Sequence, residues 1–222
     1  MIKRIPTIVF GAAGGAKDVY YWLKAANNVT QDEYYDVLGL IDSNEELQGK
    51  ILFDGIQVIG KDEDVPNLIK NIERVALIVP FGDPYLRGKV VNKMNSLGNI
   101  YFPNIIHPSV IYDSEAGTMG NGNYIGPGVV IASEFTIGDH NYINTGVCFG
   151  HDIKMGCFNS INPAASCAGN VVFGNYNTLS INAAVIEETT IGDGIIIGGG
   201  AIVTKDILES GTYVGVPVRK IK

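Results

Sequence analysis

Residues 119–203 begin MGNGNYIGPGVVIASEFTIGDHNYINTGVCFGHDIKMGCFNSI and continue in the same pattern, with an apolar residue at every sixth position. These positions are Met119, Ile125, Ile131, Ile137, Ile143, Phe149, Met155, Ile161, Cys167, Phe173, Leu179, Val185, Ile191, Ile197 and Val203. The next residue is usually Gly or Ala, and an α-helical period of 3.6 residues does not produce this spacing. A sustained short period predicts a solenoid, in which each repeat stacks on its neighbours because none can bury its apolar residue alone.

The same stretch also repeats at 18 residues, which is three hexads. Glycines share this interval with asparagines three residues later, at Gly120, Asn123, Gly138, Asn141, Gly156, Asn159, Gly174 and Asn177. They predict one corner of a three-sided coil, with Gly in a tight turn and Asn side chains hydrogen-bonded along the stack. Small apolar residues repeat likewise at Val129, Val147, Ala165, Ala183 and Ala201. We expect a parallel β-helix of about five coils, spaced about 4.8 Å apart.

One further column of the 18-residue repeat is irregular. It runs Ser133, His151, Gly169, Glu187, Lys205. Packing alone does not dictate such a mixture, so we look for the chemistry here. A corner histidine beside the acidic Asp152 can act as a base near neutral pH. One coil on, at about 4.8 Å, Gly169 lets a thioester approach the backbone amide.

Composition narrows the possible functions. The chain has 222 residues, enough for one or two domains, and its net charge of −7 argues against nucleic-acid or anionic-membrane surfaces. No apolar run is long enough to span a membrane. The three cysteines lack C-x-x-C spacing, which favours reduced thiols and a cytoplasmic location. In the second half, basic residues gather near the C-terminus, and any bound anion is expected there, at Lys205, Arg219 and Lys220. The alternative is a solvated basic tail.

The first half alternates strands and helices, which predicts a small open parallel sheet. The apolar run 5–10 ends in the glycine-rich turn 11–15, and a helix is expected over residues 16–26. A strand, glycine turn and helix N-terminus can bring amides to a phosphate, and Asp42 follows the second strand where a carboxylate can bind ribose or base. The glycines do not match G-x-G-x-x-G, so a turn that binds nothing is the alternative. We divide the chain into residues 1–104, 105–210 and a C-terminal tail, 211–222.

The chain resembles the hexapeptide-repeat sugar acyltransferases of the NeuD/PglD family, the sialic acid O-acetyltransferases and UDP-4-amino-sugar N-acetyltransferases. The resemblance covers essentially the whole chain. It rests on the glycine turn and on residues 39–42, Ile106-His107-Pro108-Ser109, Gly150-His151-Asp152, Cys167-Ala168-Gly169-Asn170-Val171 and Gly215-Val216-Pro217. It implies a Rossmann-like N-terminal domain followed by a left-handed parallel β-helix, in a homotrimer that binds acetyl-CoA between adjacent β-helices, with no metal.

The resemblance also implies roles for individual residues. His151 would be the catalytic base, Asp152 its orienting partner and Gly169 the amide donor to the thioester oxygen. Gly199 would lie beside the pantetheine arm. The nucleotide of the acceptor sugar would be approached by four residues of the N-terminal domain, Gly11, Gly14, Asp42 and Ser43.

Two positions depart from the family pattern. Many relatives have His where this chain has Gly15, which puts that contact to the sugar nucleotide in doubt. Many also carry a second His nine residues after the catalytic one, where this chain has Ser160. A role of that His in acceptor binding is therefore absent here or filled differently.

The remaining candidate residues are expected to be structural. His107 lies at the junction of the two halves, His140 is expected to be an exposed turn residue, and Cys157 an inert surface or interface thiol.

The expected function is acetyl-CoA-dependent N-acetylation of a UDP-linked 4-amino-4-deoxy sugar in surface glycan or glycoprotein synthesis. The alternatives are O-acetylation of sialic acid or another glycan hydroxyl, a metal enzyme of the γ-carbonic anhydrase kind, and a non-catalytic trimeric scaffold that binds nucleotide sugars. No two of the three histidines, His107, His140 and His151, are separated by a multiple of 18 residues, so they cannot stack into one zinc ligand set within a chain.

Overall fold

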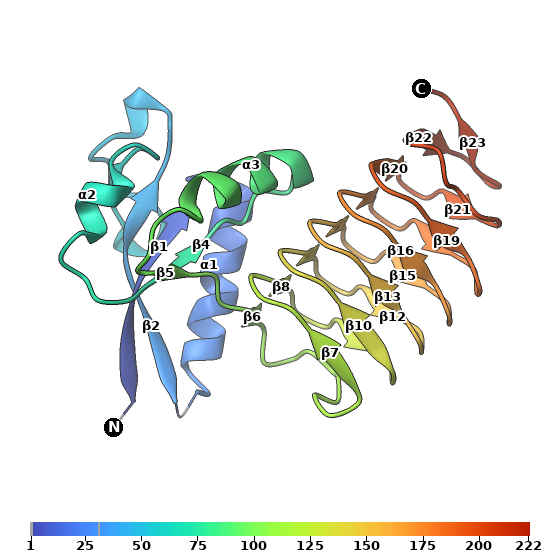
Figure 1. The fold of residues 1–222 in the computed structure, drawn as a ribbon, viewed down its shortest axis with the longest axis horizontal. Helices are drawn as coiled ribbons and strands as arrows, with labels where there is room; N and C mark the ends of the chain where they lie inside the picture. Colours follow the sequence, from blue (N-terminus) through green and yellow to red (C-terminus); the bar gives the residue numbers. More distant parts are fainter. Residues whose placement is uncertain (1, 31) are drawn as a thin grey trace.

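A computed structural model describes residues 2–30 and 32–222 and shows a sheet with helices joined to a stack of coils (Figure 1). The sheet comprises β1 (Lys3–Phe10), β2 (Glu33–Ile41), β3 (Val58–Gly60), β4 (Val75–Ile78) and β5 (Ile100–Tyr101). The strands are parallel and lie in the order β3-β2-β1-β4-β5. The helices are α1 (Gly14–Asn27), α2 (Val65–Ile69) and α3 (Pro84–Met94), with short 3₁₀ turns at Glu45–Leu47 and Phe53–Gly55.

Alternate residues of the central strands face opposite sides of this sheet, as the pleat requires. Val9, Leu40 and Ile78 pack with α1, whereas their neighbours pack in a second cluster with Val65 of α2 and Val91 of α3. Both faces are therefore covered, which explains why these strands read as continuous apolar runs.

The coils form a left-handed parallel β-helix with three faces. The first, the β7 face, contains β7 (Gly117–Met119), β10 (Phe135–Ile137), β13 (Lys154–Met155), β16 (Val172–Phe173) and β19 (Thr190–Ile191). The β8 face contains β6 (Ile105–Ile106), β8 (Tyr124–Ile125), β11 (Tyr142–Ile143), β14 (Ser160–Ile161), β17 (Thr178–Leu179), β20 (Ile195–Ile197), β22 (Gly211–Val214) and β23 (Arg219–Lys220). The β9 face contains β9 (Val130–Ile131), β12 (Cys148–Phe149), β15 (Ser166–Cys167), β18 (Ala184–Val185) and β21 (Ile202–Val203).

On each face, strands that lie one coil apart pair in register at intervals of 18 residues between β10 and β21, as the repeat predicts. The hexad residues and the small apolar series fill one continuous core. At the corners, non-glycine residues such as Asp152, Phe158 and Asn182 adopt positive φ, where glycine is otherwise favoured. Each coil turns through such residues, which aim the preceding corner side chains outward.

The predicted asparagine ladder is present and buried. The Asn141 amide donates to Asn123 Oδ1 and the Asn159 amide to Asn141 Oδ1, each at 2.8 Å. Their side-chain amides bond carbonyls of the neighbouring coil, including Asn159 Nδ2 to Gly174 O at 3.0 Å. The ladder thereby satisfies corner amides that have no water contact.

Both ends of the β-helix are covered. At the start, β6 pairs with β8 and leads in from the N-terminal sheet. At the end, β22 pairs with β20 and is followed by β23, which runs antiparallel to it. Residues 211–222, which we named a tail, thus extend the β8 face and bury Tyr213 and Val218.

The N-terminal sheet packs on the β8 face, and a buried arginine lies at this junction. Arg87 of α3 is fully buried and donates hydrogen bonds through all three guanidinium nitrogens, to the carbonyls of Phe81, His140 and Asn159 and to Ser160 Oγ. Ser160 in turn donates to Gly82 O at 2.6 Å. Burial lowers the pKa of Arg87 to about 10, so it remains charged at neutral pH. The loop after β4 is thereby held to the β-helix.

Candidate active site

His151 and Asp152 lie on the corner between the β9 and β7 faces, directly after β12. His151 Nδ1 lies 2.7 Å from Asp152 Oδ2, and both side chains are exposed, by 59% and 42%. Asp152 has φ of 59°, and its amide donates to Ser133 O of the preceding coil. The pair can therefore receive a substrate from solvent.

Gly169 lies one coil further along the same corner. A Cβ placed on Gly169 would lie 2.5 Å from His151 Nε2, so the imidazole ring lies over this glycine and leaves no room for a side chain. The two coils are joined by the Asn170 amide, which donates to His151 O at 2.9 Å. The Gly169 amide itself donates no hydrogen bond to any residue that the structure describes.

This geometry can hold a base beside an amide donor. With Asp152 ionised, its carboxylate accepts the Nδ1 proton, which leaves the lone pair on Nε2. Nε2 faces Gly169, where an unpaired N–H group can stabilise a developing oxyanion. The shared edge that the sequence analysis requires is therefore present, while the catalytic roles stay predictions.

The three predicted phosphate-binding residues gather at the C-terminal end. Lys205, Arg219 and Lys220 line one pocket of about 520 Å³, and Lys220 Nζ bonds Glu209 Oε1 at 2.5 Å. Lys205 continues the column of His151 and Gly169, three coils beyond His151.

Gly199 lies elsewhere on the β-helix. It follows β20 on the corner between the β8 and β9 faces, over Ile181 of the preceding coil. The width of the β9 face separates it from the His151 corner. One pantetheine arm therefore cannot lie along both Gly199 and the His151 corner of a single chain.

The predicted nucleotide-binding residues lie together at the carboxyl edge of the N-terminal sheet. Gly11 has φ of 87° and its amide bonds Ile41 O, which joins the ends of β1 and β2. Asp42 Oδ1 accepts the Asn44 amide at 2.9 Å, and Gly14 and Ser43 are exposed. A Cβ on Gly15 would lie 2.7 Å from Pro80 O, so the close packing of α1 against β4 excludes a side chain there.

The predicted residues thus form two groups that one chain keeps apart. The N-terminal half packs on the β8 face through Trp22 of α1 over Gly126, Val79 after β4 on Tyr124, and Arg87 of α3 on Ser160. His151 lies on the corner between the other two faces. A nucleotide sugar at the carboxyl edge and the base of the same chain are therefore on different sides of the β-helix.

The expectation for His140 was wrong. His140 is 9% exposed, and its ring stacks on Phe158, with centroids 5.0 Å apart, while Phe102 meets it edge-on. Burial lowers the pKa of His140 to about 4; Asp139 opposes this shift and Arg87 adds to it. The corner is buried because the N-terminal sheet docks over it.

Sequence reasoning also missed the residues of the domain junction. Arg87 reads as a charged position on a helix surface, and Ser160 as a substitution for a substrate-binding His. The structure buries both completely. The one sequence signal for their burial is their position near apolar residues. Arg87 lies one helical turn before Val90 and Val91, and Ser160 directly precedes Ile161.

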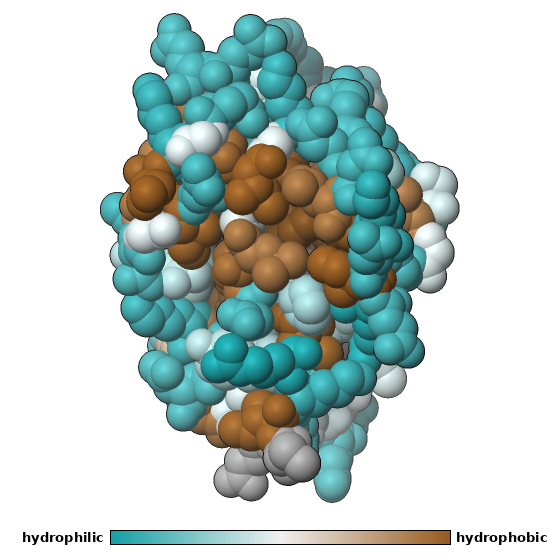
Figure 2. All heavy atoms as spheres, turned by 90° about the vertical axis from the view of Figure 1, so that its left-hand side faces the viewer, coloured by the Kyte–Doolittle hydropathy of each residue, from teal (hydrophilic) through white to brown (hydrophobic). Residues whose placement is uncertain are grey.

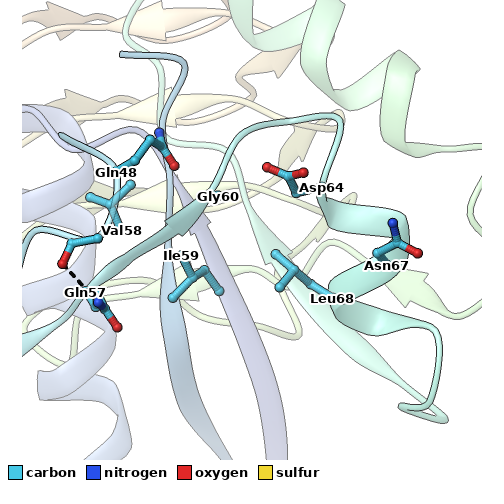
Figure 3. A pocket seen from close by; sticks show the side chains of 9 residues that line it. Gln48, Gln57, Val58, Ile59, Gly60, Asp64, Asn67 and Leu68 are labelled. Carbon is cyan, nitrogen blue, oxygen red and sulfur yellow. Dashed lines mark hydrogen bonds between the residues drawn. The ribbon is translucent and has the colours of Figure 1, made fainter. Parts of the chain in front are cut away.

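A further pocket lies at the outer end of the N-terminal sheet. Figure 2 looks onto this end and shows apolar side chains gathered at its centre, surrounded by polar ones. The pocket, of about 620 Å³, lies between β3 and α2, and Figure 3 shows Ile59 and Leu68 beside the polar Asp64 and Asn67. None of the predicted site residues lines it.

Within residues 2–30 and 32–222, no cluster of three or more His, Cys, Asp or Glu side chains has an arrangement that could hold a metal ion. Over the same residues, no helix is both long and apolar enough to cross a membrane.

No family model matches the chain, and no curated protein matches it either. Solved structures do. PerB from Caulobacter crescentus, in complex with CoA and GDP-perosamine, is 30% identical with a TM-score of 0.87, over 98% of this chain and 97% of that one. A histidine-to-asparagine mutant of the Caulobacter perosamine N-acetyltransferase is 29% identical with a TM-score of 0.87, over the same shares of both chains. WeeI from Acinetobacter baumannii, 23% identical with a TM-score of 0.76 over 99% of this chain and all of the other, shares the fold.

The match to PerB extends over both the N-terminal sheet and the β-helix. The resemblance drawn from the hexads and the Gly150-His151-Asp152 corner is thereby confirmed. The chain belongs to the hexapeptide-repeat sugar N-acetyltransferases.

Proposed function

We propose that this protein transfers the acetyl group of acetyl-CoA to the amine of a nucleotide-linked amino sugar. The observation that carries the proposal is the corner where His151, held by Asp152, lies over the bare backbone of Gly169. The relatives that bind CoA and GDP-perosamine support the same substrate classes.

The reaction follows from the two groups at this corner. His151 Nε2 takes a proton as the amine nitrogen bonds to the thioester carbonyl carbon. The carbonyl oxygen gains negative charge, which the Gly169 amide stabilises. The C–S bond then breaks, and the CoA thiolate takes the proton back from the imidazolium. Asp152 holds the imidazole in the tautomer that this cycle needs.

The same column supports a position for the cosubstrate. Lys205 lies three coils from His151, which is about 14 Å at the usual strand spacing. We infer that acetyl-CoA runs along this edge, with its phosphates near Lys205, Arg219 and Lys220. Gly199 then belongs to the site only if the pantetheine arm also meets a second β-helix.

A homotrimer with shared sites fits this arrangement. Residues 1–104 would bind the nucleotide sugar through Gly11, Gly14, Asp42 and Ser43, and residues 105–210 would bind acetyl-CoA. Because these groups lie on different sides of one β-helix, we propose that the base comes from an adjacent copy. We place the protein in the cytoplasm, where acetyl-CoA and nucleotide sugars are made.

The base at position 151 would also serve a hydroxyl acceptor. Whether the product is an N-acetyl or an O-acetyl sugar therefore depends on which acceptor the protein binds. The expected nucleotide was UDP, while PerB carries GDP-perosamine. The assay therefore follows thiol release from acetyl-CoA with GDP-perosamine, UDP-linked 4-amino sugars and free sialic acid. Acetylation of a nucleotide amino sugar supports the proposal, and activity with sialic acid alone contradicts it.

His151→Ala tests the mechanism in the same assay. We expect kcat to fall about 10²- to 10⁴-fold, the usual contribution of a general base, while acetyl-CoA still binds. His107→Ala is the matched control, because that histidine contacts Ser109 at the first coil, away from the corner. Turnover of His151→Ala at the rate of the wild type would remove the mechanism.

A further inference from the structure

Helix α1 begins at the carboxyl edge of the N-terminal sheet without a capping side chain. Its N-cap is Ala13, which has no side-chain hydrogen bond to offer, and no acidic residue lies in its first turn. Among the described residues, the amides of residues 12–16 donate no hydrogen bond. A Cβ on Gly14 would meet no atom within 4 Å, so the first turn faces open space. A run of free amides at a helix N-terminus favours an anion.

A hydroxyl from the β-helix reaches the same turn. The Tyr142 side chain, on the β8 face, is 4% exposed, and its hydroxyl lies 4.0 Å from the place of a Cβ on Gly15. This hydroxyl has no hydrogen-bond partner among the described residues, yet it is not sealed from solvent. Buried tyrosines usually find a partner for their hydroxyl, and here that partner can be a water or a ligand.

The neighbours of Tyr142 on adjacent coils show what distinguishes it. Tyr124, one coil before, accepts the Val79 amide at 2.6 Å, and Ser160, one coil after, donates to Gly82 O. The three residues form one outward row, in register at 18 residues. Two of them fasten the loop after β4 to the β-helix. Tyr142, between them, is left free and points to the start of α1.

The charges around Tyr142 are of both signs. Burial, aided by Asp18, raises the pKa of Tyr142, so the hydroxyl keeps its proton and can donate. Arg87 is near enough to act against that shift, and its charge has no carboxylate within salt-bridge distance among the described residues. The exposed Asp18 is the opposing charge. The donors at this turn are therefore the free amides and the Tyr142 hydroxyl.

We propose that Tyr142 is a substrate-positioning residue, whose hydroxyl donates a hydrogen bond to the diphosphate of the nucleotide sugar at the N-terminus of α1. The inference rests on the proposed function and adds to it a contact from the β-helix to the substrate. Position 15 cannot supply a side-chain donor, because Pro80 O leaves no room for a Cβ there. The hydroxyl on the facing β-helix takes that place.

Tyr142→Phe tests this with little risk to the fold, since it removes one unpaired hydroxyl and keeps the ring. The probes are GDP and UDP, titrated into full-length protein by calorimetry, followed by steady-state kinetics on the acetylated nucleotide sugar. We expect about tenfold weaker binding of the diphosphate and an equal rise in KM for the sugar, as for a hydrogen bond to a charged group. The KM for acetyl-CoA and the kcat should stay within about twofold of wild type. Tyr176→Phe is the matched control, a β-helix tyrosine stacked on Phe158 away from this turn.

The outcomes separate this inference from the function it rests on. If wild type binds GDP or UDP and Tyr142→Phe binds it equally well, the inference is overturned and the function stands. If only the KM of the complete sugar changes, the hydroxyl contacts the sugar and the diphosphate assignment is wrong. If wild type neither binds a nucleotide nor acetylates a nucleotide sugar, both fail.

Discussion

His151 and Gly169 depend on each other at the level of single atoms. The imidazole lies over the Gly169 backbone, and Asp152 holds its far nitrogen at 2.7 Å. The position of the base in the structure is thus bounded by a carboxylate on one side and by a missing side chain on the other. Asp152 has a positive φ, so the same residue both makes the turn at this corner and holds the base.

Gly169→Ala should displace the base without touching it chemically. The added methyl would lie 2.5 Å from two atoms of the imidazole, so the ring must leave its place. We expect kcat to fall about 100-fold or more, comparable to loss of a general base, with thermal stability little changed. Gly98→Ala, where a Cβ meets no atom within 4 Å, is the control. Full activity of Gly169→Ala would show that the ring is not used where it lies.

His140 makes stability depend on pH. Its pKa is about 4 when folded and about 6.5 when unfolded, so the unfolded chain binds more protons between these values. The free energy of unfolding therefore falls as pH falls from 6.5 to 4, by about 3 kcal/mol from this residue. His140→Phe keeps the stacking and loses no hydrogen bond, since Nδ1 has no partner among the described residues.

We expect urea unfolding of His140→Phe and wild type to differ by about 3 kcal/mol more at pH 4 than at pH 7. The carboxylates are common to both proteins, so the difference isolates His140. Parallel pH curves for the two proteins would contradict the buried neutral histidine.

At the scale of elements, the asparagine ladder holds one corner of every central coil. Asn159 Oδ1 accepts the Asn177 amide at 2.9 Å, and its Nδ2 bonds Asn141 Oδ1 and Gly174 O. Asn177, by contrast, has an Nδ2 without a partner in the described part of the chain, while its Oδ1 accepts the Ile195 amide. The ladder is complete in its middle and open at its end.

Asn159→Ala should lower the free energy of unfolding by about 3 kcal/mol, because it leaves a buried amide and a buried carbonyl unsatisfied. Asn177→Ala, which loses the Ile195 contact alone, should cost about half as much. Chemical denaturation of both variants measures the difference. Equal losses would mean that the side-chain amides contribute nothing.

The elements could be predicted to different degrees. The coils were predicted with their register, because the inward residue of each hexad is determined by its own turn and the next one. Ile161 and Val185, for example, lie in the core of the β-helix, and their burial does not depend on what packs against its outer surface. The corner residue His140 was misread, because its burial depends on two groups outside the repeats. Arg87 of α3 donates to its carbonyl, and Phe102 of the connecting segment meets its ring.

At the scale of the molecule, Arg87 joins the two parts. Its guanidinium reaches carbonyls in the loop after β4 and on two coils, through a planar group with five N–H donors. This joint sets where the carboxyl edge of the sheet, and any ligand on it, lies relative to the β-helix. The joint, like Tyr142, could not be predicted from the sequence, because it exists only after the two parts have docked.

Arg87→Lys should weaken this joint although it conserves the charge. An ammonium group cannot match the five donors of the fork, and it stays buried. We expect a loss of about 3 kcal/mol and, in calorimetry, separation of one unfolding transition into two. Arg4→Lys is the control, since Arg4 is 70% exposed in its pair with Asp36 and should change little. A single transition at the wild-type temperature would show that docking does not depend on the fork.

The antiparallel β23 has a bearing on how these molecules behave at high concentration. A stack of parallel rungs presents unpaired backbone at its terminus, which can recruit another chain and grow into a filament. Here the last rung is followed by a two-residue antiparallel strand, Arg219–Lys220, carrying two positive charges, and at the opposite end β6 pairs with β8 and leads in from the N-terminal sheet. Truncation before β23 would uncover β22, and the shortened protein should then form fibres that the intact one avoids.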